Sequence, residues 1–548
     1  MKTYIKNTLL TLTVTGLLMA CSTDELDVKN PNQPTPSSAA TEVGVISLAQ
    51  GTVYINGMGN SSAGIKYYDG VPGGFWTGAV GFHALMGDEV GEEAANQFGN
   101  QIGMPDLVTL DDGTKVTNPS SVNTQIALIR TVNVNAQGGA NPLFNEWAYM
   151  YNLNNGMNSV LEIAASTKFA GDAAAQTAKL NTLKAWAYWW KGYAYSRIGS
   201  IYYAGLINDK PGVTTGNYVT KEKIIEEAAK NFDLASTALT ALGAGGTDYT
   251  AVMRGLIPSF NQVGKGVVPT PDEWKRNINT MKARNIVVNT PAKSMTAAQW
   301  GQVLTLTNDG VRAADKVFTG RSNSNSDFMS RLDGNIAAKS TGPTGGTFKI
   351  SERLIQDFPA GDKRLDNNFT KQPAAILFNQ DRGNSFNTRW LIDDGGKGMA
   401  GVVVLNNRVE GAYELYLAST FEENELMKAE AKIYTSDIAG GLTAIDVVRT
   451  SQGAGLAPLS GLTQAQALEE LRKERRVALA FRGLAFYDAR RWGVITDGRK
   501  GAVVVDKAGK VSTNATINYN FLDYWDVPDN ELAYNPAAAG SAATKNPK

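Results

Sequence analysis

Four carboxylates stand close together in the segment "HALMGDEVGEEAANQFGN" and are the residues of this sequence best suited to acid–base chemistry. Asp88 and Glu89 are followed closely by Glu92 and Glu93. Two carboxylates that flank a glycosidic bond can hydrolyse it, with one acting as the acid and the other as base or nucleophile. Adjacent like charges on so short a stretch are more often exposed to solvent, so we expect no catalytic pair here.

The rest of the composition excludes most other catalytic centres. The chain has one histidine, His83, and one cysteine, Cys21. A zinc site needs several imidazole or thiolate ligands, and a thiol enzyme needs a base beside its cysteine. The sequence also has no phosphate-binding loop and no nucleophile elbow. It therefore predicts a protein that is not an enzyme, with no catalytic residue, no metal and no cofactor.

Charge is balanced along the chain, with 52 Lys and Arg against 52 Asp and Glu. This balance predicts no nucleic-acid partner, because such proteins carry a basic surface. Arginines nevertheless crowd into "LRKERRVALAFRGLAFYDARRWG", residues 471–493. We expect the arginines to flank a buried helix face and then to pair with Asp488 or stack on neighbouring aromatic rings, so their role is structural.

The N-terminal residues have the pattern of an exported, lipid-anchored protein. Lys2 and Lys6 precede a short apolar run, and residues 1–20 are predicted to be a signal peptide. Residues 18–21, "LMAC", resemble the bacterial lipoprotein box, which implies acylation of Cys21. Residues 21–41 are rich in Pro, Asn, Ser and Thr and predict a flexible tether. The acidic residues just after Cys21 resemble a signal for export to the outer cell surface.

Residues 42–548 are predicted to form a single, mainly α-helical body. Apolar residues recur at helical spacing and come in neighbouring pairs, which is typical of irregular tetratricopeptide-like hairpins. A loop-rich insertion with short strands is expected at about 332–417, where Gly, Asn and Asp are frequent. Aromatic residues at 186–195 are expected to pack in the core rather than to bind a ligand. The helices are expected at residues 147–165, 180–203, 221–242, 296–318, 421–434 and 465–482.

Several motifs occur in the order found in the SusD/RagB family of outer-membrane nutrient-binding lipoproteins, which this chain resembles. The lipoprotein box is followed by "HALMGDE", "KGYAYSRIGSIYY", "LMKAEAKIY", "VVRTSQGAGL", "ERRVALAFRGLAFYDARRWG" and "VPDNELAYNP". The resemblance implies a lipid-anchored protein of the outer membrane, facing the cell exterior, that captures a nutrient, usually a glycan. It also implies a partner, a TonB-dependent transporter of the SusC type, to which the ligand is delivered.

Ligand contacts are expected in the loop after the "GDE" segment and in the variable middle of the chain, where related proteins often build their site. A flat aromatic ring can stack on a sugar, and polar side chains can bond to its hydroxyl groups. Each aromatic residue can equally serve in packing. A peptide ligand, or a structural role without any ligand, are the alternatives to glycan binding. The candidate contacts are Phe98, Asn100, Trp274, Phe386, Arg389 and Trp390.

Overall fold

The computed structural model describes residues 40–58, 79–92, 98–118, 122, 124–320, 348–376, 387–406 and 415–548. The predicted signal peptide, Cys21 and nearly all of the predicted tether lie outside these ranges. Within them, no helix is both long enough and apolar enough to cross a membrane. The architecture is mainly α-helical, as the sequence predicts, with several small antiparallel sheets.

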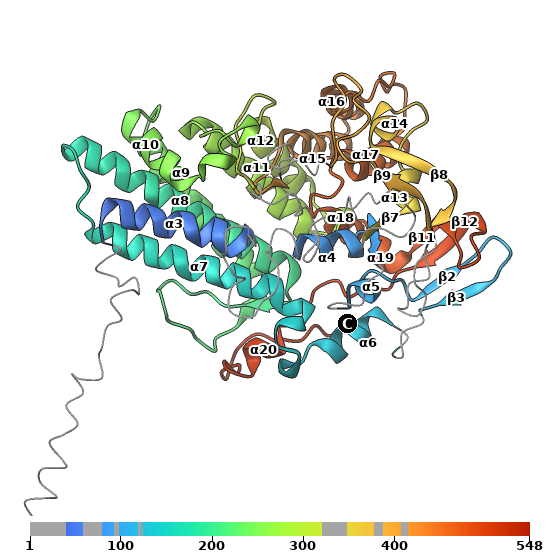
Figure 1. Ribbon diagram of the computed structural model, residues 1–548, viewed down its shortest axis with the longest axis horizontal. Helices are drawn as coiled ribbons and strands as arrows, with labels where there is room; N and C mark the ends of the chain where they lie inside the picture. Colours follow the sequence, from blue (N-terminus) through green and yellow to red (C-terminus); the bar gives the residue numbers. More distant parts are fainter. Residues whose placement is uncertain are drawn as a thin grey trace, which may run out of the picture.

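Long helices form one side of the molecule, seen on the left in Figure 1. Helix α3 (Glu42–Met58) packs against α7 (Pro142–Ser166) and α8 (Ala173–Ile201), and α9 (Lys221–Ala241) runs along α8. From residue 185 to its end, α8 is buried at every position except Tyr188, as expected for a helix enclosed on all sides. Gly192 permits this packing, because a Cβ there would lie 2.7 Å from the ring of Phe232.

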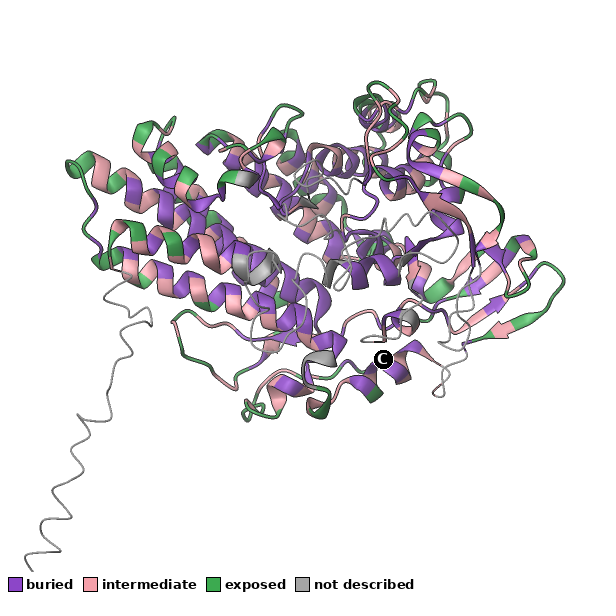
Figure 2. Cartoon of the chain, viewed as in Figure 1, coloured by how far each residue is buried: buried purple, intermediate pink, exposed green. Residues whose placement is uncertain are grey.

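The aromatic residues of α8 form the centre of this core. Trp186, Trp189 and Trp190 are fully buried. Trp190 packs edge to face with the other two, which both pack edge to face with Phe318. Such edge-to-face pairs add to the free energy gained from burying the rings. Figure 2 shows the buried residues running through these helices. The expectation that these aromatics pack in the core is confirmed.

Three shorter helices follow: α10 (Thr247–Leu256), α11 (Pro271–Asn289) and α12 (Ala297–Asn308). Capping boxes at Thr270 and Thr296 fix the start of α11 and α12. Helix α12 ends at Asn308, ten residues before the predicted end at 318. Soon after this end, Gly310 packs directly against Thr280 and Asn424, where no side chain fits.

The C-terminal helices cover the other side of the molecule. They are α15 (Phe421–Tyr434), α16 (Ile438–Ser451), α17 (Gln464–Ala478), α18 (Ala485–Arg491) and α19 (Val494–Asp497). The range predicted for α15 is confirmed. Helix α17 stops at Ala478 instead of residue 482, because Phe481 takes a left-handed backbone conformation (φ 63°).

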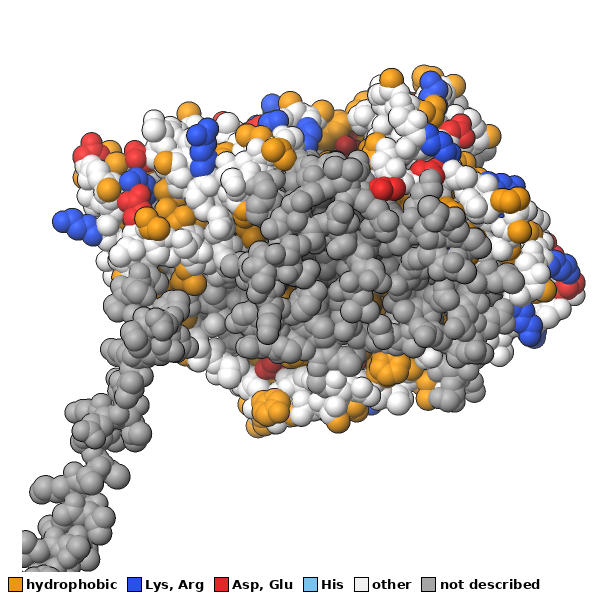
Figure 3. Space-filling view, in the orientation of Figure 1, with side chains coloured by type: hydrophobic (Ala, Val, Ile, Leu, Met, Phe, Trp, Pro, Cys, Tyr) orange, Lys and Arg blue, Asp and Glu red, His pale blue; other side chains and the backbone are white. Residues whose placement is uncertain are grey.

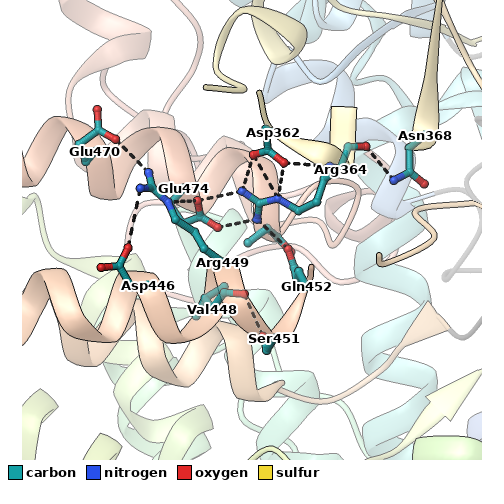
Figure 4. A network of polar contacts seen from close by, with 11 residues as sticks. Asp362, Arg364, Asn368, Asp446, Val448, Arg449, Ser451, Gln452, Glu470 and Glu474 are labelled. Atoms are coloured by element: carbon teal, nitrogen blue, oxygen red, sulfur yellow. Dashed lines mark hydrogen bonds and ion pairs between the residues drawn. The ribbon is translucent and has the colours of Figure 1, made fainter. Parts of the chain in front are cut away.

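A buried network of ion pairs joins α14 (Lys363–Asn368), α16 and α17 (Figure 4). The carboxylate of Glu474 accepts hydrogen bonds from Arg364 at 2.6 and 3.0 Å and from Arg449 at 3.0 Å. Asp362 also pairs with Arg364 at 2.7 Å, and Nη1 of Arg364, which already donates to Glu474, donates to the side-chain oxygen of Gln452 at 2.9 Å. Arg364 and Glu474 have no exposed side-chain surface, so each charge depends on these partners.

The arginines at the end of this region are held in the same way. Asp488 accepts hydrogen bonds from Arg475 at 2.8 Å and from Arg491 at 2.7 Å. The guanidinium of Arg491 also lies 4.3 Å from the ring centroid of Trp492. Arg490 lies over the rings of Phe486, Tyr487 and Tyr524. The sequence-based prediction of a structural arginine cluster that pairs with Asp488 and stacks on aromatic rings is confirmed.

Small antiparallel sheets gather beside these helices, on the right in Figure 1. The largest has the order β11-β12-β2-β3. The described parts of the predicted insertion contain short strands and helices, as expected. The strands used below are β1 (Val90–Glu92), β2 (Leu107–Thr109), β3 (Lys115–Thr117), β7 (Phe348–Ile350), β8 (Phe369–Ile376), β9 (Thr388–Ile392), β11 (Arg499–Val505) and β12 (Val511–Asn518).

Candidate functional site

The GDE segment forms a tight turn between α4 (Ala79–Met86) and β1. A Cβ at Gly87 would lie 2.6 Å from the Cβ of Ala485 and 2.8 Å from the backbone nitrogen of Phe486, so only glycine fits. Asp88 then takes a left-handed conformation (φ 54°), which Asp tolerates better than most residues. The turn sends the chain into β1, which pairs with β7 from residue 348 onward.

Asp88 is a buried anchor of this turn. Its carboxylate accepts hydrogen bonds from Arg353 at 2.7 and 3.0 Å, from Ser351 at 2.7 Å and from Tyr519 at 2.6 Å. Burial alone would raise the pKa of Asp88, but the charge and hydrogen bonds of Arg353, with Arg476 and Tyr519, hold it well below its usual range. Asp88 is therefore ionised and fully engaged in the fold.

A second arginine closes the turn from the side of α17. Arg476 donates to the backbone carbonyl oxygens of Gly87 at 2.7 Å and Asp88 at 2.9 Å, and its Nε pairs with Asp357 at 2.6 Å. Asp357, just after α13 (Glu352–Gln356), also pairs with Arg499 at 2.8 Å. We call this arrangement around Asp88, Arg353, Arg476 and Asp357 the GDE junction.

Glu89 has a different environment from its neighbour. Its carboxyl group is fully buried and accepts one hydrogen bond, from the backbone N–H of Phe481 at 2.9 Å. Burial raises the pKa of Glu89 to about 8, so the group is mostly protonated at neutral pH. Because both carboxyl groups are enclosed by the fold, they do not form an open pair that could flank a sugar. The expectation that such adjacent acids face solvent is wrong for these two.

His83 joins α4 to the long helices. Its Nε2 lies 2.8 Å from Glu146 of α7, and Glu146 also pairs with Arg197 of α8 at 2.6 Å. All three residues are buried, and burial lowers the pKa of the imidazole despite the nearby carboxylate. The histidine thus serves in packing, and no cluster of His, Cys, Asp and Glu suited to a metal occurs in the described part of the chain.

Two of the predicted ligand contacts, Arg389 and Trp390, lie on β9, which packs beside β7 and α13. Arg389 forms a two-pronged ion pair with Glu352, with distances of 3.0 and 2.7 Å. Since Glu352 directly precedes Arg353, β9 is tied to the GDE junction. The structure therefore ties β9, in the variable middle of the chain, to the GDE turn, and a ligand site formed there stays a prediction.

Trp390 is half-buried on β9, opposite Lys371 of β8. Its indole N–H has no hydrogen-bond partner among the described residues. That nitrogen is buried, so only the exposed part of the ring is available, and it is suited to a ligand that offers a flat apolar face. The side chain of Arg389 next to it is 24% exposed, so both residues retain surface for a contact.

The other predicted contacts are more scattered. Phe98 is half-buried at the start of α5 (Gly99–Ile102), packed against the main core. Asn100 lies in α5, but its side chain is outside the described structure, as is the whole of Phe386. Trp274 is 1% exposed and packs edge to face against Trp186 and Phe318. The prediction for Trp274 is corrected by this burial, because its ring offers no surface to a ligand.

Sequence reasoning missed the partners that organise the junction. Arg353 lies 265 positions from Asp88, and Tyr519 lies 431 positions from it. Neither residue belongs to a local motif that would mark it. The only usable indication was the pairing requirement itself, since a buried carboxylate must have a cationic or hydrogen-bonding partner.

Charges on the face shown in Figure 3 are interspersed, with basic and acidic side chains of the described residues side by side. No large region of one sign is visible among them. This agrees with the neutral composition.

Comparison with known proteins shows which fold this chain has. Residues 425–539, from α15 to the closing segment, match the SusD family model. A SusD-like protein from Bacteroides fragilis has a TM-score of 0.54 at 14% identity, covering 84% of this chain and 92% of its own. The chain has a SusD-like fold. A SusD superfamily protein from Bacteroides vulgatus has a TM-score of 0.53 at 13% identity, with 90% of this chain and 97% of its own covered.

A third structural neighbour is the surface glycan-binding protein A from Bacteroides fluxus. It has a TM-score of 0.51 at 13% identity, and the match covers 94% of this chain and 99% of that protein. None of the curated proteins matches the sequence. The SusD resemblance drawn from the motifs is thus confirmed, by the family match in the C-terminal helices and by the fold across most of the chain.

Proposed function

We propose that this SusD-like protein binds a glycan at the cell surface. The observation that carries the proposal is the SusD fold, within which β9 places a half-exposed tryptophan beside the GDE junction. Trp390 supplies a partly exposed aromatic ring, and Arg389 supplies a partly exposed guanidinium whose N–H groups can donate to hydroxyl oxygens. Sugars present apolar C–H faces and hydroxyl groups, which match these two kinds of group. The surface glycan-binding protein from Bacteroides fluxus, with the same fold, supports this choice.

Anchoring and location form the second part of the proposal. Residues 1–20 are the signal peptide, Cys21 carries the lipid, residues 21–41 form the tether, and residues 42–548 form the body. Several acyl chains on Cys21 would hold the protein stably at the outer membrane, because each buried methylene contributes about 0.8 kcal/mol. The acidic residues after Cys21 support an orientation toward the cell exterior.

The proposed partner is a TonB-dependent transporter of the SusC type. A protein that only binds a glycan at the surface does not import it, so capture requires a channel that takes up the ligand. The family resemblance supports a transporter that works as a barrel with this protein as its hinged cover. Copurification of the transporter with the membrane-anchored protein tests this part separately from ligand binding.

Binding without catalysis is the proposed mode of action. Asp88 is committed to Arg353, and Glu89 is enclosed beside the backbone of Phe481, so neither is placed to act on a sugar. Glu93 and the side chain of Glu92 lie outside the described residues. A peptide-binding receptor and a structural lipoprotein without a ligand are the alternatives.

Calorimetric titration of the purified protein against neutral oligosaccharides and oligopeptides tests the proposal. We expect one glycan class to bind, and Trp390→Ala to weaken that binding. Tyr534→Ala is the matched control, because Tyr534 is an aromatic residue far more exposed (83%) than Trp390 and lies outside β9. Binding of peptides alone would identify a peptide receptor. No binding of either class, with the transporter also absent after copurification, would favour a structural role.

A further inference from the structure

A cavity lies against the GDE junction and is lined by none of the residues of β9. It has a volume of about 450 Å³ and is enclosed by the GDE turn, the end of α13, helices α17 to α19 and the start of β11. This volume lies within the range of about 300 to 1,000 Å³ typical of small-molecule sites. Its apolar wall includes Trp492, Val494 and Ile495, and the rest of the lining is mostly charged.

The charges that line this cavity are not balanced once their outside partners are considered. Five cationic side chains and four carboxylates, those of Asp88, Asp357, Glu469 and Asp488, line it. Two of these carboxylates are already neutralised by arginines that are not part of the lining. Asp88 is paired with Arg353, and Asp488 is paired with Arg475 and Arg491. Asp357 and Glu469 in the lining, with Glu470 outside it beside Lys473, remain to offset the five cations.

The two inner arginines of the cavity already form ion pairs and hydrogen bonds. Arg476 binds Asp357 and the carbonyl oxygens of the GDE turn, and Arg499 binds Asp357 and the carbonyl oxygen of Arg353. Both guanidinium groups are thus already paired with Asp357. The cations without such tight pairs lie at the rim.

The other three cations lie at the rim of the cavity. Two of them form long ion pairs, and the third forms none with a described residue. The side chain of Arg472 is 40% exposed and lies 3.5 Å from Glu469, and that of Lys473 is 37% exposed and lies 3.6 Å from Glu470. Lys500 is exposed and has no ion pair with any described residue. An anionic group entering here would meet three ammonium or guanidinium groups without having to break a tight pair.

We propose that this cavity binds a small polyhydroxy carboxylate, of which a uronic acid is the simplest, through Arg472, Lys473 and Lys500. The carboxylate of the ligand lies among the rim cations, and its ring lies against the apolar wall beside Trp492. Hydroxyl groups bond to the lining carboxylate of Asp357, which already faces the cavity. The site is separate from β9 and does not depend on the glycan role proposed above.

Titration of the purified full chain with glucuronate, and with glucose as the neutral counterpart, tests this site. The two sugars differ only in the carboxylate, so we expect glucuronate to bind at low ionic strength and glucose not to bind. The double variant Lys473→Gln/Lys500→Gln should lower the affinity about tenfold or more, because hydrogen bonds to charged groups are the stronger kind. Added salt should weaken binding of the unmodified protein.

The matched control is the double variant Lys210→Gln/Lys293→Gln, which removes the same charge from exposed lysines outside the cavity. It should bind glucuronate like the unmodified protein, and both double variants should keep its melting temperature. No binding of glucuronate, equal binding of glucose, or an equal loss in both double variants would overturn the proposal. Loss of neutral oligosaccharide binding in Trp390→Ala tests β9 alone and leaves this result unaffected.

Discussion

The carboxyl group of Glu89 accepts a hydrogen bond from the backbone N–H of Phe481, a residue 392 positions further along the chain. Phe481 has a left-handed backbone conformation (φ 63°) in the turn after α17. The contact therefore fastens the GDE turn to the point where α17 ends. The second carboxyl oxygen of Glu89 has no partner among the described residues, so this buried group is favoured as a neutral acid.

The burial of Glu89 predicts that this residue lowers the stability of the protein as pH rises from about 5 to 8. Burial raises the pKa of Glu89 to about 8, so the folded protein holds a proton that the unfolded chain loses near pH 4.5. The free energy of unfolding therefore falls by up to about 1.4 kcal/mol for each pH unit within this window. Glu89→Gln stays neutral and keeps the acceptor, so its melting temperature should fall less between pH 5 and pH 8.

The control for this comparison is Glu226→Gln, which changes an exposed glutamate of α9. Its melting temperature should follow that of the unmodified protein across the same pH range. Parallel curves for Glu89→Gln and the unmodified protein would contradict the assignment of a raised pKa to Glu89.

Removing the charge of Asp88 should destabilise the protein strongly. Asp88→Asn keeps the size of the side chain and tolerates the left-handed conformation, but it leaves Arg353 buried without its counter-charge. Loss of one partner from a buried pair costs about 3 to 5 kcal/mol. Urea unfolding followed by tryptophan fluorescence measures this loss.

Lys282→Gln is the comparison for the Asp88 variant. It removes the exposed ion pair with Asp233, which should cost less than about 1 kcal/mol. Similar losses in the two variants would mean that Asp88 and Arg353 are no more important than a surface pair.

Two tryptophans should respond in opposite ways to alanine substitution. Trp274→Ala empties a place in the aromatic core, so it should cost about 3 to 5 kcal/mol of stability and leave ligand affinity unchanged at low temperature. Trp390→Ala should lower glycan affinity about tenfold, since a loss of about 1.4 kcal/mol is a factor of ten. Thermal unfolding and calorimetry on both variants separate the two effects. Normal affinity in Trp390→Ala would remove β9 from the site.

Substitution of the single cysteine should release the protein from the membrane. Cys21→Ser keeps the size of the side chain but removes the thiol that the lipoprotein pattern requires. We expect loss of labelling by a radioactive fatty acid and recovery of the protein in the soluble fraction. Unchanged labelling of Cys21→Ser would show that the lipid is attached elsewhere or that none is attached through this pattern.

The sequence predicted the helices much better than the junction that positions the site. The predicted bounds of helix α15 match the structure, because its apolar residues recur at helical spacing and the helix begins directly after a capping threonine, Thr420. The end of α17 was placed too late, since periodicity continues into a turn that is set by the distant contact between Glu89 and Phe481. Local patterns carry no information about such partners.

The same limit applies to the candidate contacts. Trp274 and Trp390 both occur among polar residues, and only the packing shows that one is enclosed by other rings while the other remains half-exposed. Arg389 was a reasonable choice, but its pairing with Glu352 depends on a strand and a helix that are far apart in sequence. Side-chain type identified the candidates, and tertiary structure had to select among them.

The attachment of the start of α3 to the long helices has a mechanical consequence. Glu42, at the start of α3, pairs with Lys179 of α8 and accepts a hydrogen bond from the backbone of Ala170, at the turn between α7 and α8. This turn lies at the end of the long helices, whereas β7, β9 and α13 lie on the opposite side of the molecule (Figure 1). With Cys21 anchored as proposed, the α3 end acts as a pivot and the long helices as a lever arm. A small rotation at the pivot then produces its largest displacement at the GDE junction.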